Sequence, residues 1–87
     1  MKAIILYHPH SEEARTLEEY AEDYSRRTSQ PIHLMSLETR EGAATASLYD
    51  IVRYPAMMVL DADGHLQKEW QGTELPLMDE LSGYLAA

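Results

Sequence analysis

The sequence of 87 residues contains no cysteine, no phenylalanine and only seven lysines and arginines. Without cysteine the chain forms no disulfide, no thiolate nucleophile and no cysteine-bound zinc or iron–sulfur site. The few cations stand against 15 acidic residues, which gives a net charge of -8. Such a chain lacks the basic stripe that neutralises phosphate groups, so we expect no nucleic-acid partner.

Long hydrophobic runs are also missing. The apolar run at residues 3–7 is shorter than the hydrophobic region of a signal peptide, and no stretch approaches the length of a membrane span. We therefore expect a cytoplasmic protein that does not contact membranes. At this length we expect one small domain covering residues 1–87, with modest stability.

The apolar residues that are present fall in periodic runs, which predict a folded chain. Six tyrosines, five methionines and one tryptophan supplement the aliphatic residues. The predicted strands are residues 3–7, 32–37, 56–60 and 65–70, and the predicted helices are residues 11–27, 39–50 and a last helix that begins near Pro76. The order is βαβαββα, so the fold class is α/β with a mixed four-stranded sheet and helices on both faces.

Strand positions and directions follow from the pattern. The first two strands are apolar enough to be interior, whereas residues 65–70 alternate as an edge strand does. The first three strands are expected to run largely parallel, because helices connect them. The last two form an antiparallel hairpin around Asp63 and Gly64.

The sequence predicts caps and faces for the three helices. Ser11 is expected to cap the first helix and Thr39 the second, whose inner face would carry Ala44, Leu48 and Ile51. On the wet face of the first helix, the spacing predicts an ion pair from Glu22 to Arg26 and another from Asp23 to Arg27. The inner face of the last helix is expected to carry five apolar residues. These are Leu77, Met78, Leu81, Tyr84 and Leu85.

Several segments together resemble the thioredoxin and glutaredoxin superfamily. Residues 7–11 (Tyr-His-Pro-His-Ser) join the first strand to the first helix, and residues 48–56 contain Tyr54-Pro55 directly before the third strand. Asp63-Gly64 is similar to the hairpin turn of that family. The resemblance covers nearly the whole chain and implies a cis proline at Pro55. It also places Ser11 and Ala14 where the family has its two active cysteines, so thiol–disulfide exchange is excluded.

The resemblance further implies where a ligand would bind. The groove of the family holds an extended peptide or glutathione by main-chain hydrogen bonds, and here it would be formed by His10, Ser11, Arg53, Tyr54 and Pro55. The backbone at residues 53–54 is expected to be unpaired. We therefore predict a redox-inactive domain that binds a protein or peptide, with no catalytic residue and no cofactor.

Alternatives stay open at this point. Ser11 could instead orient the thiol of glutathione, as in a small-molecule transferase, although Ser is also an ordinary helix cap. Two copies could pair through residues 65–70 or through helices, so the chain is either a monomer or a weak homodimer. His8 and His10 offer only two metal ligands, so no metal site is predicted, and no group that would orient them for acid–base catalysis is evident. Trp70 is either an exposed anchor for a partner or a cover for the sheet.

Overall fold

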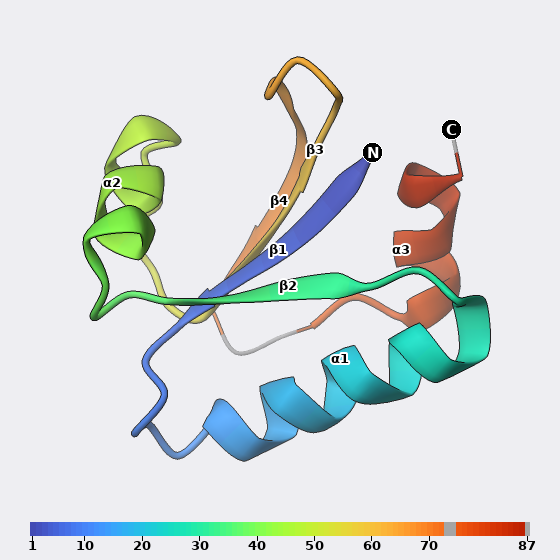
Figure 1. Cartoon of the computed structure of the whole chain (residues 1–87), viewed down its shortest axis with the longest axis horizontal. Helices are drawn as coiled ribbons and strands as arrows, with labels where there is room; N and C mark the ends of the chain where they lie inside the picture. The colour runs from blue at the N-terminus through green and yellow to red at the C-terminus, as the bar shows by residue number, and fades with distance from the viewer. Residues whose placement is uncertain (73–74, 87) are drawn as a thin grey trace.

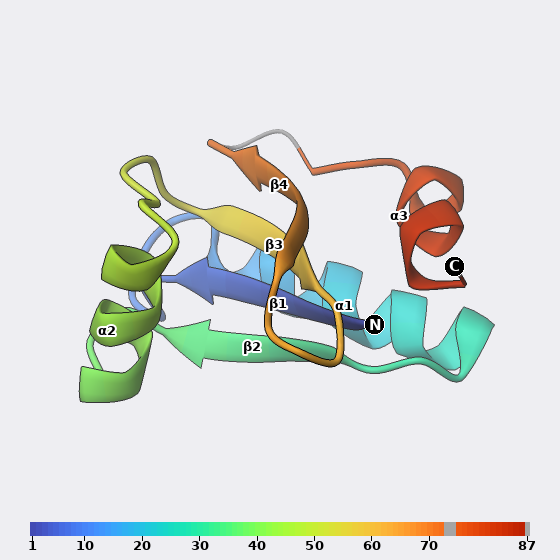
Figure 2. The same cartoon turned by 90° about the horizontal axis from the view of Figure 1, so that it is seen from above.

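A four-stranded sheet lies between helices on its two faces (Figures 1 and 2). The computed structural model describes residues 1–72 and 75–86. Along the chain the elements are β1 (Lys2–Tyr7), α1 (Ala14–Thr28), β2 (Ile32–Ser36), α2 (Arg40–Leu48), β3 (Ala56–Leu60), β4 (Leu66–Gln71) and α3 (Met78–Leu85). The predicted order βαβαββα and the α/β class are confirmed. No helix within the described residues is both long enough and apolar enough to span a membrane.

Two hydrophobic cores fill the space on either side of the sheet. Because side chains alternate along a strand, Ile5 of β1 packs against α1 and α3, and its neighbour Leu6 packs on the side of α2. Strand β3 divides in the same way between Met57 and Met58. Both strands are buried on both faces, which explains why their sequences are continuously apolar.

The direction of β3 differs from the prediction. Strands β1 and β2 run parallel, as expected, but β3 runs antiparallel to β1, with Ala56 opposite Leu6. Helix α2 has nine residues, about 14 Å, and lies across the end of the sheet where β1 and β2 finish (Figure 2). The chain therefore enters β3 from the end at which it left β2, and the antiparallel direction follows.

The position of β2 was also predicted wrongly. The strand order is β2-β1-β3-β4, so β2 forms one edge of the sheet rather than an interior strand, while β4 is an edge strand as predicted. Ile32 is buried against α1, but His33 and Leu34 are exposed. An apolar sequence does not distinguish an interior strand from an edge strand that a helix covers on one face.

Helix α1 begins later than predicted, and Ser11 does not cap it. The Ser11 hydroxyl donates to the carbonyl oxygen of His8 at 2.7 Å, and the Ser11 N–H donates to the same oxygen at 3.0 Å. These bonds form a tight turn that precedes the helix. The N-cap residue is Glu13, whose side chain makes no capping hydrogen bond.

Helix α2 has the predicted cap but a different buried face. The Thr39 hydroxyl oxygen accepts a hydrogen bond from the N–H of Gly42 at 3.0 Å, so the predicted cap is confirmed. The buried residues of the helix are Gly42 and Ala46, whereas Ala44 and Leu48 are exposed. The helix approaches the end of β2 so closely that only glycine fits at position 42.

Helix α3 closes the core through its own apolar face and through two tyrosines of α1. Leu81 and Leu85 are buried as predicted, but Leu77 precedes the helix and is exposed. The Tyr20 hydroxyl donates to the carbonyl oxygen of Pro76 at 2.8 Å, and the Tyr24 hydroxyl bonds with Ser82 at 3.0 Å. These bonds fix α3 on the face that α1 covers.

Trp70 contributes to the same core at the outer strand. Its ring meets the ring of Tyr84 edge-to-face, with 5.7 Å between the ring centroids. The amino group of Lys68 lies 5.7 Å from the centroid of the Trp70 ring. Of the two interpretations of Trp70, this geometry favours a cover for the sheet over an anchor for a partner.

Candidate functional site

A small hollow lies where the turn after β1 meets the loop before β3. Its volume is about 40 Å³, and its walls are His8, Ser11, Glu13, Tyr54 and Pro55. Two segments separated by some 40 positions along the chain therefore meet there. The meeting follows from the sheet, because β1 and β3 are adjacent and antiparallel, so β3 starts beside the end of β1.

The Tyr54 side chain covers part of this hollow. Its ring meets the His8 ring edge-to-face, with 5.9 Å between the ring centroids. Its hydroxyl donates to the carbonyl oxygen of Ile51 at 2.9 Å, which fixes the ring across its own loop. The exposed fraction of Tyr54 is still 40%, so a ligand can reach the ring.

The backbone at Tyr54 carries the unused hydrogen-bonding groups of the site. The Tyr54-Pro55 peptide bond is cis. Within residues 1–72 and 75–86, neither the N–H nor the C=O of Tyr54 makes a hydrogen bond. Pro55 is different, because its C=O accepts from the Gly72 N–H at 2.8 Å. One donor and one acceptor at the same residue are therefore available to a ligand.

The backbone of residues 53–54 was predicted to be unpaired, and for the Arg53 N–H that prediction was wrong. The side-chain oxygen of Gln71 accepts from the N–H of Val52 at 3.1 Å and from the N–H of Arg53 at 3.0 Å. The other end of the Gln71 side chain donates to Glu69 at 2.7 Å. The end of β4 thus occupies donors that the sequence left unassigned.

The Ser11 hydroxyl is committed to a local bond. Because its proton is donated to the His8 carbonyl oxygen, only its lone pairs face other groups. A serine that stabilises a thiolate has to donate a proton to it. The observed geometry therefore offers no donor at Ser11 unless the turn rearranges.

Of the five residues predicted to form the groove, three line the hollow together and two do not. Ser11, Tyr54 and Pro55 are brought together, whereas His10 is exposed in the turn and Arg53 extends toward Gly72. The structure adds His8 and Glu13 to the walls. Both lie within two positions of Pro9 or Ser11 in the sequence, but which way each side chain points depends on the tight turn at His8.

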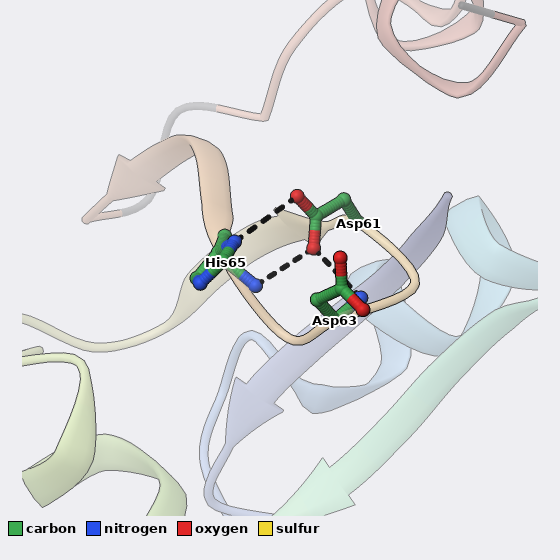
Figure 3. Close-up of side chains that lie close together, drawn as sticks. All are labelled: Asp61, Asp63 and His65. Carbon is green, nitrogen blue, oxygen red and sulfur yellow. Dashed lines mark hydrogen bonds and ion pairs between the residues drawn. The ribbon is translucent and has the colours of Figure 1, made fainter.

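A second group of polar side chains lies at the hairpin between β3 and β4 (Figure 3). Atoms of Asp61, Asp63 and His65 that could ligate a metal lie within 4.8 Å of one another. One Asp61 oxygen accepts from the backbone N–H groups of Asp63 and His65, each at 2.9 Å, and the other accepts from Gln67 at 3.1 Å. The backbone bond from His65 is the largest cause that lowers the pKa of the Asp61 carboxyl group. The hydrogen bonds of the hairpin turn therefore explain why the side chains of Asp61, Asp63 and His65 lie close together.

The fold of this chain is thioredoxin-like. Among solved structures, thioredoxin 1 from the thermophilic eubacterium Thermosipho africanus TCF52B is similar with a TM-score of 0.70, and the match covers 99% of this chain and 91% of that one. The two sequences are 10% identical, so the likeness establishes the fold alone. No protein-family model and no curated protein matches the sequence. The expected thioredoxin-like fold in a cysteine-free chain is thereby confirmed.

Proposed function

We propose that this chain is a redox-inactive binding module that holds an extended segment of another protein at the hollow beside Tyr54. The observation that carries the proposal is the free N–H and C=O of Tyr54 next to an exposed aromatic ring. An extended peptide offers a C=O and an N–H from one residue to such a pair, as in strand addition. The ligand is held by its backbone, and the ring of Tyr54 contacts one of its side chains.

The rest of the site supports binding without chemistry. The sequence has no cysteine, so no thiolate can attack a disulfide. His8 packs against Tyr54, and the Ser11 hydroxyl is bonded to the His8 carbonyl oxygen. The hollow of about 40 Å³ is large enough for a single small group, so the ligand lies along the surface and inserts only one side chain.

The test is a selection of random heptapeptides displayed on phage against the folded protein. Peptides enriched on the wild-type protein are then tested for retention by the Tyr54→Asp variant, in which a charge replaces the ring that contacts the ligand. Enriched peptides are then synthesised and titrated into the ¹⁵N-labelled protein. We expect amide shifts at Ser11, Tyr54 and Ala56, because these residues lie at or beside the hollow.

Tyr54→Phe is the matched control. It keeps the aromatic ring and removes only the hydroxyl that bonds to Ile51, so binding should change little. If Tyr54→Asp retains every enriched peptide at wild-type levels, or if the shifts avoid these residues, the hollow is not the binding site.

A further inference from the structure

Strand β2 presents unused backbone groups along one edge of the sheet. The Leu37 N–H donates to the Tyr7 carbonyl oxygen at 2.9 Å, and Ser36 lies opposite Tyr7 in the parallel pairing with β1. Backbone groups of successive strand residues point alternately to the two sides, so those of Ile32 and Leu34 point away from β1. Within the described residues neither one makes a hydrogen bond through these groups.

Strand β2 lacks the charged residues that usually protect a free edge. Residues of β2 carry no lysine, aspartate or glutamate, and Leu34 is 40% exposed. The opposite edge strand, β4, contains Lys68 and Glu69. Charged side chains on an edge discourage pairing with a further strand, so the two edges of this sheet are not equivalent.

Helix α1 runs beside the same edge (Figure 1). A hollow of about 370 Å³ lies along the junction of the two elements and is lined by residues of both. Its carboxylates belong to Glu18 and Glu22, which are both exposed. Its apolar side includes Ile32 and Leu34 of the strand.

These two carboxylates are the ones that the arginines of α1 leave without a charged partner. Arg15 pairs with Glu19 at 3.2 Å, while Arg26 and Arg27 both pair with Asp23, at 3.1 and 3.4 Å. The predicted pair from Glu22 to Arg26 does not form. In the part of the chain that the structure describes, no ion pair involves Glu18 or Glu22. The Glu18 carboxylate accepts a hydrogen bond from the hydroxyl of Tyr7 at 3.1 Å.

We propose that the β2 edge is a second binding surface, which takes a basic extended segment of a partner as a fifth strand. The backbone of the segment pairs with Ile32 and Leu34. Side chains two residues apart lie on the same face of a strand, so lysines or arginines at alternate positions face Glu18 and Glu22. This surface follows the edge strand β2, whereas Tyr54 lies in the loop before the interior strand β3, and the proposal does not depend on the function proposed for that hollow.

Charge argues for a basic partner rather than for a second copy of this chain. Each copy carries a net charge of -8, and pairing two β2 edges would bring two acidic α1 helices toward each other. Like charges near an interface oppose association, whereas opposite charges favour both its rate and its specificity.

The probe is an acetylated and amidated heptapeptide with lysine at its second, fourth and sixth positions and threonine or valine between them. It is titrated at low salt into the ¹⁵N-labelled protein. We expect amide shifts centred on Ile32 and Leu34, with smaller shifts at Glu18 and Glu22. The same peptide with glutamate in place of lysine should produce no shifts, and binding should weaken as salt is added.

Two variants test the two halves of the proposal. Glu18→Gln/Glu22→Gln should weaken binding by about two- to thirtyfold, the range expected when two exposed ion pairs are lost. Glu19→Gln/Glu41→Gln removes the same net charge elsewhere and should bind as the wild type does. Leu34→Pro removes an outward N–H that the fold does not use, and it should abolish binding.

Several results would overturn the proposal. These are shifts centred on Tyr54 and Ala56, an absence of shifts, equal weakening by both double variants, and dilution-dependent shifts at β2 in the free protein. The last result would mean that a second copy occupies the edge. If Leu34→Pro does not give the dispersed spectrum of a folded protein, the wild-type protein is titrated instead with a peptide methylated on alternate backbone nitrogens. Unchanged binding of that peptide also overturns the proposal.

Discussion

The side-chain oxygen of Gln71 accepts a hydrogen bond from the backbone N–H of Arg53 at 3.0 Å, and it also accepts from the N–H of Val52 at 3.1 Å. Gln71 is the last residue of β4, and the two amides lie in the loop that leads to Pro55. One side chain therefore ties the outer strand to the segment that carries the free backbone of Tyr54. This tie holds one wall of the candidate site in place.

We expect Gln71→Ala to lower the free energy of unfolding by about 1 kcal/mol, because the three hydrogen bonds of its side chain are lost at a site that water partly reaches. In a domain of this size the melting temperature would fall by about 4–8 °C. Thermal unfolding followed by circular dichroism measures the change. Gln67→Ala is the control, since Gln67 bonds only within the exposed hairpin. Equal stability of the two variants would contradict the role given to Gln71.

Two glycines in helices are expected to respond in opposite ways to alanine. A methyl group at Gly42 would overlap the carbonyl oxygen of Ser36, whereas nothing lies within 4 Å of one at Gly83. Gly42→Ala should therefore destabilise the fold by about 1–3 kcal/mol through overpacking. Gly83→Ala should stabilise it by about 0.5–1 kcal/mol, since alanine has the higher helix propensity. Urea unfolding of both variants tests the pair, and stabilisation by Gly42→Ala would show that α2 can move away from β2.

The order of elements was predictable because it depends on local patterns. The run at residues 56–60 gave the bounds of β3 correctly, and Thr39 marked the start of α2. The direction of β3 was not predictable in this way. It depends on the end of the sheet at which the chain emerges from α2 and enters β3. The edge position of β2 depends likewise on the order of the strands in the whole sheet, which no local pattern gives.

The candidate site shows the same division. The X-Pro sequence and the resemblance placed Tyr54 and Pro55 correctly beside Ser11. The hydrogen bonds from Val52 and Arg53 to Gln71 join residues nearly twenty positions apart, and no local pattern marks such a contact. Of the two predicted ion pairs of α1, the pair from Asp23 to Arg27 forms, whereas the pair from Glu22 to Arg26 does not, because Arg26 pairs with Asp23 instead.

The ionisation of Tyr20 should make stability depend on pH in the alkaline range. Burial raises the pKa of Tyr20 to about 12, with further contributions from Tyr24 and Glu80. A hydroxyl whose pKa is raised on folding stabilises the native state fully below its unfolded pKa of about 10, and this contribution is lost as pH rises through the folded value. Urea unfolding between pH 9 and about 12 should show the loss for the wild type and a smaller loss for Tyr20→Phe. Equal pH dependence of both proteins would contradict the assignment.

Millimolar glutathione should leave the melting temperature unchanged. The thiolate of the tripeptide would need a donor, but the Ser11 hydroxyl is bonded to His8, and the Arg53 N–H beside Tyr54 is bonded to Gln71. A ligand specific for the native state stabilises it by about 1.4 kcal/mol at ten times its dissociation constant, so binding of that strength is visible in thermal unfolding. A rise of several degrees that disappears in Ser11→Ala would show that the turn rearranges, and it would support the transferase alternative. A rise that persists in Ser11→Ala but disappears in Tyr54→Asp would assign the tripeptide to the free backbone of Tyr54.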